Sequence, residues 1–298
     1  MKILITGGSG LLGQYLNEIL SKENEICTLY NENLGNCKVY NSFKINLTDF
    51  ESLKEFITSY KPGVIIHTAA ISRPESCDKL PKEIVESINI DTTKFFAEYC
   101  EKNNSKLIFT STDLVYDGEQ GMYLDENANL KPVSLYAETK VKSENEIRNV
   151  FENYIILRVS LLYGMGLNHS VNNFHIMLNN FLQNRKSKLF HDQYRTPLSL
   201  LDAAELIRKL IKADIKNETI NFGGRERISR AELGEIVCSA GNFDPNLIDK
   251  ISMNEIKDLH KVADVSMNTS KLNSFGLVQK TVEESVIEIL NKFFNIYR

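Results

Sequence analysis

The sequence has little of what marks a nucleic-acid-binding or a membrane protein. Its 298 residues carry a formal net charge of −4, so there is no basic excess to neutralise the phosphates of a nucleic acid. No run of 18 apolar residues occurs, and the apolar stretch at the start of the chain is too short for a signal peptide. We therefore expect a cytoplasmic protein without a nucleic-acid or membrane partner.

Cysteine and histidine are also sparse, and neither shows the spacing of a metal site. The five cysteines include no Cys-x-x-Cys pair, and the five histidines include no His-Glu-x-x-His motif. This usage is typical of a cytoplasmic protein whose thiols are reduced and buried. We expect no catalytic metal ion.

What the sequence does contain is a regular alternation of strand-like and helix-like segments. With 42% hydrophobic and 25% charged residues, the composition is that of a globular protein. Short apolar runs rich in β-forming residues lie at residues 2–6, 25–30, 63–70, 106–112 and 154–160. Segments with helical spacing lie between them, at residues 11–22, 49–60, 82–103 and 136–150. This order predicts an α/β fold with a doubly wound, parallel sheet of the Rossmann type, covered by helices on both faces.

The rhythm changes after residue 163. Helices are expected within 170–183, 195–214 and 229–241, a strand at 218–224 and an amphipathic helix near the C-terminus. Because the strand at 218–224 resembles sheet material, we expect the chain to cross back to the sheet. We predict a cofactor-binding Rossmann domain at 1–163 that also receives roughly residues 195–224, and a smaller C-terminal substrate lobe formed mainly by 164–298.

A glycine-rich loop follows the first predicted strand. Gly7, Gly10 and Gly13 are spaced as Gly-x-x-Gly-x-x-Gly between that strand and the first predicted helix. A tight turn, bare backbone beside a pyrophosphate and free N–H groups at a helix start are what a bound dinucleotide requires. We predict that this loop, with Leu11 and Leu12, binds the cofactor.

The choice between NAD and NADP depends on the end of the second strand. In this fold an acidic residue there holds the adenosine ribose hydroxyls, whereas an arginine accepts a 2′-phosphate. Tyr30 ends the strand and Glu32 lies farther along. Because the carboxylate is missing from the strand end, we expect NADPH or NADH, with a slight preference for NADPH.

Two tyrosines are each followed by a lysine four residues later: Tyr136 with Lys140, and Tyr40 with Lys44. On a helix this spacing puts both side chains on one face, but among 12 tyrosines it also arises by chance. Only Tyr136 and Lys140 are accompanied by a hydroxyl-rich strand end, at 110–118. Since ligands of doubly wound sheets bind beyond the carboxyl ends of the strands, this copy is the predicted catalytic pair.

Taken together, these motifs resemble those of the extended short-chain dehydrogenases/reductases. The matching segments are Thr-Gly-x-x-Gly-x-x-Gly at 6–13, Asn46-Leu47 before Asp49, His-Thr-Ala-Ala at 67–70, Asn89, Ser-Thr-Asp-Leu-Val-Tyr-Asp-Gly at 111–118 and Tyr-x-x-x-Lys at 136–140. Within that group the chain looks most like the dTDP-4-dehydrorhamnose reductase family, on the segments 158–164, 191–197 and 263–276. The resemblance covers nearly the whole chain.

The resemblance implies catalytic roles for three residues. Tyr136 would be the general acid that protonates a carbonyl oxygen during hydride transfer. Lys140 would lower the pKa of that tyrosine and hold the nicotinamide ribose. Thr112 would hydrogen-bond the reacting oxygen.

The resemblance also implies binding residues. Asn46 and Leu47 would contact adenine, and the small Ala69 and Ala70 would let the cofactor lie against the backbone. Asp113 is a candidate substrate residue. Arg195 resembles the arginine that many nucleotide-sugar epimerases place on the substrate diphosphate.

Three positions depart from the reductase pattern. Leu114 and Leu161 stand where a tyrosine and a tryptophan are usual in that family, and Arg195 where a small residue is common. All three are expected near the substrate, so the identity of the sugar stays open.

We expect NAD(P)H-dependent reduction of a 4-keto-6-deoxy nucleotide sugar. The alternatives are a nucleotide-sugar epimerase or dehydratase of the same fold, and a non-catalytic regulatory subunit resembling that of methionine adenosyltransferase. The expected partners are a nucleotide-sugar substrate and a second copy of the chain in a homodimer.

Overall fold

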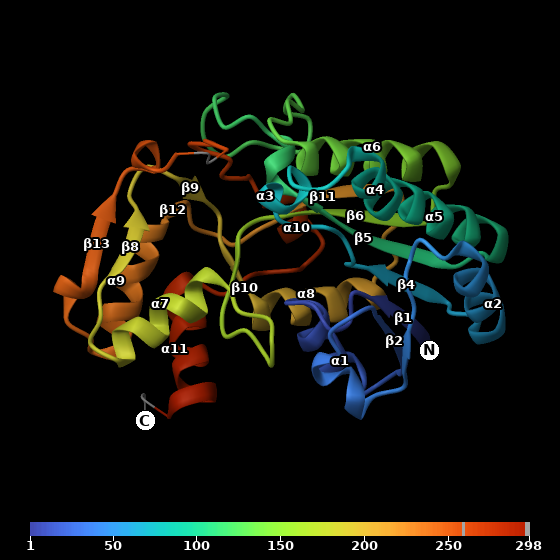
Figure 1. The fold of residues 1–298 in the computed structure, drawn as a ribbon, viewed down its shortest axis with the longest axis horizontal. Coiled ribbons are helices and arrows are strands. Elements are labelled where there is room, and N and C mark those ends of the chain that lie inside the picture. Colours follow the sequence, from blue (N-terminus) through green and yellow to red (C-terminus); the bar gives the residue numbers. More distant parts are fainter. Residues whose placement is uncertain (258–259, 296–298) are drawn as a thin grey trace.

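A seven-stranded parallel sheet forms the centre of the protein in the computed structural model, which describes residues 1–257 and 260–295 (Figure 1). The strand order is β11-β6-β5-β4-β1-β2-β3, and every pair is parallel. The strands are β1 (Lys2–Thr6), β2 (Glu25–Tyr30), β3 (Ser42–Lys44), β4 (Val64–His67), β5 (Lys106–Thr112), β6 (Tyr154–Val159) and β11 (Glu218–Phe222). The predicted doubly wound α/β fold is confirmed, and the strand order reverses between β1 and β4.

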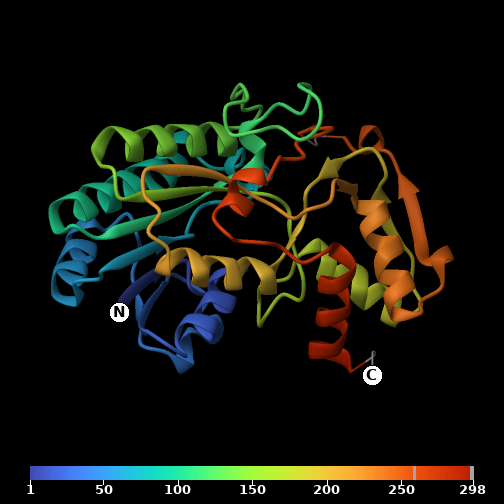
Figure 2. The same cartoon turned by 180° about the vertical axis from the view of Figure 1, so that it is seen from behind.

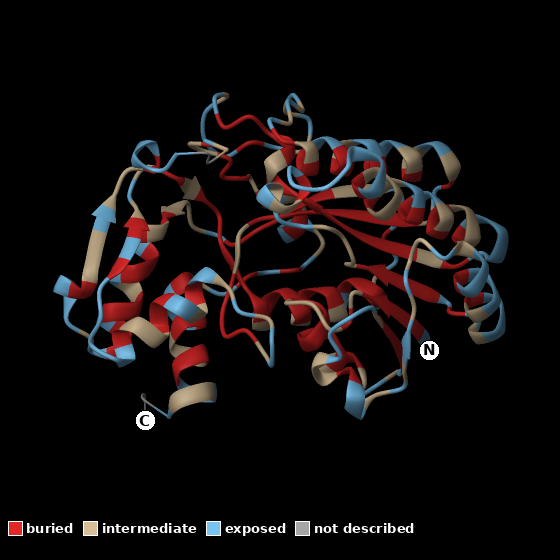
Figure 3. Ribbon diagram, in the orientation of Figure 1, coloured by how far each residue is buried: buried red, intermediate tan, exposed pale blue. Residues whose placement is uncertain are grey.

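Helices cover both faces of this sheet. The helices α1 (Gly13–Leu20) and α8 (Leu200–Lys212) pack on the face that presents Ile3 and Ile5. On the opposite face, which presents Leu4, lie α2 (Phe50–Tyr60), α5 (Thr92–Asn103) and α6 (Leu135–Val150). Figures 1 and 2 show α8 below the strands and α5 and α6 above them. Because both faces are covered, the strands are buried along most of their length (Figure 3).

A second, smaller lobe follows β6 in the chain. Its hydrophobic core is separate from that of the sheet. The lobe contains α7 (Asn173–Leu182), β8 (Ser187–Phe190), α9 (Arg230–Gly241), β13 (Ile248–Ile251) and α11 (Val282–Phe294), with β8 paired to β13. Between its segments the chain returns to the sheet, where β11 pairs with β6. The division into a domain at 1–163 and a lobe at 164–298 stays a prediction.

Short elements connect these parts. They are η1 (Gly35–Val39), α3 (Pro74–Cys77), α4 (Lys82–Glu86), the π-helical turn η2 (Ser87–Asp91), η3 (Asp113–Val115), β7 (Leu162–Tyr163), β9 (Tyr194–Arg195), β10 (Leu198–Ser199), β12 (Ile228–Ser229), η4 (Pro245–Leu247), η5 (Met253–Glu255) and α10 (Ser270–Ser274). The helical segment expected at 82–103 is therefore interrupted by a π turn.

Two local features differ from the sequence-based expectation. The strand expected at 63–70 ends at His67, because Thr68 turns back and donates a hydrogen bond from Oγ1 to the carbonyl of Thr6, 2.7 Å away. The three-residue strand β3 was not expected, and it extends the sheet by pairing with β2. In contrast to these two differences, the capped helix expected at 229–241 is confirmed. It is α9, and Ser229 and Glu232 form a capping box at its start.

The five cysteines are all buried and unpaired, as predicted. Within residues 1–257 and 260–295, no group of three or more His, Cys, Asp or Glu side chains could hold a metal ion. None of the helices described is long and apolar enough to cross a membrane.

Candidate active site

In the glycine loop between β1 and α1, the packing of the loop requires glycine at Gly7 and Gly13 but not at Gly10. Gly7 has a φ of +67°, and a Cβ there would lie 2.9 Å from the backbone of Ala69. A Cβ on Gly13 would lie 2.1 Å from the carbonyl oxygen of Gly7. By contrast, a Cβ on Gly10 would approach nothing closer than that same oxygen, at 3.1 Å. Gly7 and Gly13 are therefore needed for the turn, whereas Gly10 leaves room beside the loop.

The start of α1 leaves N–H groups for a ligand. Its N-cap residue is Leu12, which offers no side-chain acceptor. The Leu12 side chain is itself buried in the core beneath the sheet, so only its backbone can face a cofactor. An uncapped helix start behind a glycine turn fits the pyrophosphate of a dinucleotide.

The segment after β4 packs directly against this loop. The backbone N–H of Ala69 donates to Thr6 Oγ1 over 3.2 Å, and Ala70 follows it. Asn46 and Leu47 follow β3, farther out in the sheet order. The Asn46 carboxamide oxygen accepts hydrogen bonds from its neighbour Thr48. The predicted adenine contacts of Asn46 and Leu47 stay predictions.

The predicted catalytic tyrosine is buried and lies beside Thr112. Tyr136 is in the first turn of α6, which Ser134 caps, and its side chain is only 7% exposed. Burial raises the pKa of Tyr136 above its usual range, and the neighbouring Thr112 side chain lowers it by less. Thr112 also accepts a hydrogen bond from the N–H of Leu114. The structure therefore brings the end of β5 and the start of α6 together at one point.

Lys140 lies one helical turn further along α6. Its Nζ donates to the carbonyl of Thr110 over 2.8 Å and lies 4.5 Å from the ring centroid of Phe109 and 6.0 Å from that of Tyr136. Burial lowers the pKa of Lys140 to about 7, against an opposing effect of Glu144. A cation that gives one hydrogen to a backbone carbonyl keeps donors for a bound ligand.

The second Tyr-x-x-x-Lys copy has a different local structure. Tyr40 directly follows the 3₁₀ turn η1, and Lys44 ends strand β3. The two residues therefore do not share a helix face. Tyr40 packs partly against the hydrophobic core, while Lys44 is exposed.

The two predicted substrate residues form a buried ion pair next to Thr112. Arg195 Nε lies 3.4 Å from Asp113 Oδ2, and both side chains are less than 10% exposed. Asp113 also accepts hydrogen bonds from Ser160 and Thr112. Burial raises the pKa of Asp113 and lowers that of Arg195, and in each case the partner's charge opposes this shift. Tyr136, Thr112, Asp113 and Arg195 therefore follow one another across the end of β5.

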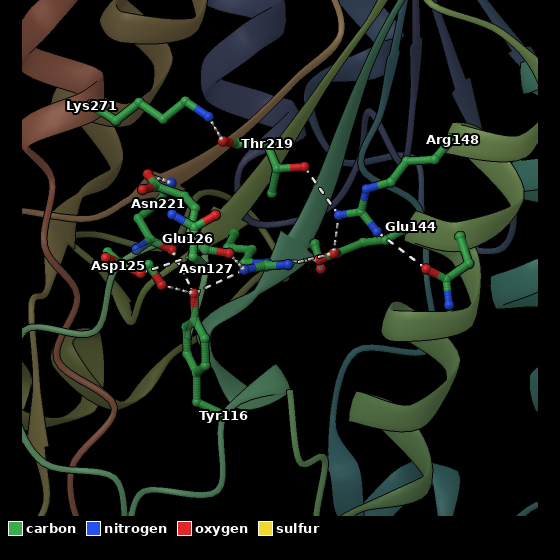
Figure 4. A network of polar contacts seen from close by, with 12 residues as sticks. Tyr116, Asp125, Glu126, Asn127, Glu144, Arg148, Thr219, Asn221 and Lys271 are labelled. Atoms are coloured by element: carbon green, nitrogen blue, oxygen red, sulfur yellow. Dashed lines mark hydrogen bonds and ion pairs between the residues drawn. The ribbon is translucent and has the colours of Figure 1, made fainter. Parts of the chain in front are cut away.

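A buried polar network behind the site was not predicted from the sequence. Glu144 is four residues after Lys140 on α6 and is fully buried. Its carboxylate accepts hydrogen bonds from Ser111 over 2.6 Å, from Arg148 over 2.7 Å and from Arg158 over 2.9 Å. Arg158 in turn donates to the hydroxyl of Tyr116, and Figure 4 shows this network from close by. The spacing from Lys140 was the available signal for Glu144, since it places both residues on one helix face.

His67 is a second residue that the sequence did not single out as functional. It is completely buried at the end of β4, with Nδ1 2.7 Å from Thr6 Oγ1 and Nε2 3.1 Å from Thr93 Oγ1. Thr93 gives its own proton to the carbonyl of Asn89, so it must accept from His67. The imidazole therefore carries its proton on Nε2 and accepts from Thr6.

The RmlD substrate binding domain family matches residues 1–295 of this chain. The chain belongs to this family.

The individual proteins that this chain is similar to differ in what they do. Methionine adenosyltransferase 2 subunit beta of Xenopus laevis is 27% identical over 286 residues, covering 94% of this chain and 84% of the relative. A probable low-salt glycan biosynthesis reductase, Agl14, of Haloferax volcanii is 25% identical and covers 96% of each chain. The crystal structure of dTDP-4-dehydrorhamnose reductase from Bacillus anthracis, in complex with NADP, superimposes with a TM-score of 0.85 at 23% identity, covering 98% of this chain and 99% of that one.

Proposed function

We propose that this member of the RmlD family is a cytoplasmic enzyme that reduces the 4-keto group of a 4-keto-6-deoxy nucleotide sugar with NADPH or NADH. The observation that carries the proposal is the buried row of Tyr136, Thr112, Asp113 and Arg195, with Lys140 behind Tyr136. This row begins at the end of β5, two strands from the glycine loop. Proton donor, orienting hydroxyl and anion-binding cation are the groups that such a reaction needs.

The glycine loop and the segment after β4 would hold the cofactor, which supplies the hydride when bound. Gly7, Gly10 and Gly13 would place the pyrophosphate at the start of α1, and the adenine would lie toward Asn46 and Leu47. Tyr30 ends β2, and the carboxylate-bearing Glu32 beyond it is exposed. NADPH is therefore proposed slightly ahead of NADH.

Tyr136 would act as the acid of the reaction. Burial keeps its phenol protonated at neutral pH, so the proton is present to be given to the carbonyl oxygen. Thr112 would hold that oxygen by a hydrogen bond, for which its hydroxyl proton would turn from Asp113 to the substrate. The charge of Lys140, near the Tyr136 ring, would favour the phenolate that remains after proton transfer.

A substrate screen tests the proposal directly. Oxidation of NADPH and NADH would be followed by absorbance in the presence of nucleotide-linked 4-keto-6-deoxy sugars, and the products identified. Cofactor oxidation that is stoichiometric with a reduced sugar supports a reductase. Conversion of a nucleotide sugar to its isomer without net cofactor oxidation would instead indicate an epimerase.

A regulatory role is the second candidate, because the methionine adenosyltransferase beta subunits cover most of this chain. In that case the chain would bind an adenosyltransferase catalytic subunit and alter its activity. Co-elution of the two proteins in size-exclusion chromatography, together with no cofactor oxidation on any keto sugar, would favour this role. The same chromatography would report whether the chain alone is a homodimer.

A further inference from the structure

Arg230 is the first residue of α9, and one N–H donor of its guanidinium is buried without a hydrogen-bond partner in the described part of the chain. Its Nε is buried, and no acceptor lies within hydrogen-bonding distance among residues 1–257 and 260–295. Leaving a charged donor unsatisfied in a buried position is costly. The side chain is therefore prepared for an anionic partner that comes from outside the chain.

The position of Arg230 places it next to the predicted substrate residues. Strand β12, directly before α9, pairs antiparallel with β9, and Ile228 lies opposite Arg195. The Arg230 guanidinium lies 5.6 Å from the ring centroid of Phe190. Burial, and to a smaller extent the charge of Arg195, lower the pKa of Arg230 to about 10, against the opposing effects of Glu75 and Asp113. Arg230 thus shares the electrostatic environment of the Asp113–Arg195 pair.

Arg195 keeps only part of its guanidinium for a ligand. Its Nε faces Asp113, and its Nη1 donates to the carbonyls of Tyr194 over 2.8 Å and Val262 over 3.3 Å. Two other arginines of this half of the chain also face carboxylates, Arg158 with Glu144 and Arg227 with Asp264. Arg158 and Arg227 also lie over aromatic rings, as Arg230 does. Arg230 differs from all three because it forms no ion pair with a carboxylate in the described part of the chain.

We infer that Arg230 binds the diphosphate of a nucleotide ligand. Its guanidinium adds donors to those of Arg195, which are partly occupied by Asp113 and by two backbone carbonyls. The inference rests on the proposed function for the class of ligand, a nucleoside diphosphate or its sugar ester. Asp113 is paired with Arg195, so the buried donor of Arg230 remains available for an anion. The planar guanidinium fork matches the oxygens of a phosphate group.

The test is a calorimetric titration of the full-length protein with dTDP, UDP and GDP, using for the variants the diphosphate that the wild type binds best. Arg230→Gln should weaken its binding by roughly ten- to hundredfold, the usual effect of losing a charge-assisted contact. Arg230→Lys should fall between the two, because it keeps the charge and loses the fork. Arg225→Gln is the matched control, since Arg225 is exposed, lies five residues earlier and carries the same charge. Its affinity should stay within about twofold of the wild type.

Three results would overturn the inference. The first is an unchanged affinity in a folded Arg230→Gln protein, which would leave Arg230 with only its contact to Phe190. The second is an equal loss in Arg225→Gln, which would show a general effect of net charge. The third is a wild type that binds none of the three diphosphates. Circular dichroism and NADPH titration of each variant would show that the fold and the cofactor site are intact.

Failure of the proposed reaction can be told apart from failure of this inference. A protein that binds a diphosphate through Arg230 but oxidises no cofactor would remove the reaction and keep the inference. A protein that reduces a nucleotide sugar with the same KM in wild type and Arg230→Gln would keep the reaction and remove the inference.

Discussion

At the scale of single residues, burial raises the pKa of Tyr136 and lowers the pKa of Lys140, the two members of the proposed acid pair. It favours the neutral form of both, which means a protonated phenol for Tyr136 and a deprotonated amine for Lys140. The pKa of Tyr136 is therefore raised, not lowered as expected from the sequence, and burial outweighs any effect of Lys140. To act as an efficient acid, Tyr136 would need the charges around a bound substrate and cofactor to lower its pKa. Because the pKa of Lys140 is lowered to about 7, a ligand that binds next to it can change its charge at neutral pH.

Replacing Tyr136 by Phe tests the acid, because it removes only the phenolic oxygen. We expect turnover to fall by roughly 10²–10⁴, the usual contribution of a positioned general acid, with NADPH affinity preserved. Lys140→Met should reduce both turnover and NADPH affinity. Tyr40→Phe is the matched control from the other Tyr-x-x-x-Lys copy and should leave both unchanged. Steady-state kinetics and fluorescence titration give the two readouts, and a fully active Tyr136→Phe enzyme would remove Tyr136 from the mechanism.

Gly10 offers a test of the cofactor loop that leaves the loop folded. An aspartate at Gly10 meets only one atom of the surrounding chain closely, but its carboxylate would occupy the place of the pyrophosphate and repel it. We expect NADPH and NADH binding to be lost while the melting temperature stays near that of the wild type. Gly13→Asp, which collides with the backbone of Gly7, should instead destabilise the protein. Equal cofactor affinity in wild type and Gly10→Asp would contradict the assignment of this loop.

The buried His67 should make the protein sensitive to acid. Burial, and to a smaller extent the charge of Lys140, lower the pKa of His67 to about 3, whereas in the unfolded chain it is about 6.5. Below pH 6.5 the unfolded state therefore binds a proton that the folded state does not. Stability contributed by neutral His67 is complete above pH 6.5 and is lost as the pH falls toward 3.

Urea unfolding of His67→Asn between pH 4.5 and pH 7 tests this expectation. The unfolding free energy of the variant should change less steeply with pH than that of the wild type, by up to about 1.4 kcal/mol per pH unit. His169→Asn replaces an exposed histidine and should keep the slope of the wild type. Parallel curves for wild type and His67→Asn would show that His67 does not titrate in this way.

At the scale of elements, the position of α6 is fixed by the network around Glu144. The carboxylate joins α6 to Ser111 on β5 and to Arg158 on β6. Arg158 extends the connection through Tyr116, whose hydroxyl lies 3.0 Å from the side-chain oxygen of Asn221 on β11. Because Glu144 is two turns from Tyr136 on the same helix, these bonds hold the proposed acid in place.

Glu144→Gln should therefore destabilise the protein strongly, although the side chain keeps its shape. Without the carboxylate, Arg158 stays buried with an uncompensated charge, which costs about 3–5 kcal/mol in comparable cases. Glu146→Gln is a matched control on the same helix, because Glu146 pairs with Lys94 at the surface, and it should cost less than about 1 kcal/mol. Equal unfolding free energies of the two variants by urea titration would show that the network contributes little.

The same elements show what the sequence can predict and what it cannot. The choice of Tyr136 and Lys140 over Tyr40 and Lys44 followed from local neighbours, namely a hydroxyl-rich strand end before a helix. The contact between Asp113 and Arg195 joins residues 82 positions apart, and only the folded chain shows it. The strand β3 has three residues, too few for a periodic pattern, and depends on its pairing with β2.

At the scale of the whole molecule, hydrogen bonds join the segment that leads into the second lobe to the glycine loop and to α1. Ser170 donates a hydrogen bond to the carbonyl of Ser9 in the glycine loop, and Gln14 donates to the carbonyl of Leu167. Tyr15 donates to the carbonyl of Met165 over 2.6 Å. The segment 165–170 therefore lies beside the place where the pyrophosphate is proposed to bind, and a cofactor bound there would lie near both parts of the protein.

The proposed reaction makes a prediction about how firmly the whole protein keeps its cofactor. A reductase must release the oxidised cofactor after every turnover, whereas an epimerase regenerates its cofactor in place and keeps it. We expect the protein, purified by size-exclusion chromatography and then denatured, to release well below one equivalent of NAD(P) into the supernatant, measured by liquid chromatography. Added NADPH should nevertheless raise its melting temperature in a concentration-dependent way, because a ligand that binds only the folded state stabilises it by mass action. Recovery of one equivalent of nucleotide from the purified protein would contradict the reductase and favour an epimerase. Little retained nucleotide combined with no stabilisation by NADPH or NADH would instead contradict the cofactor site itself.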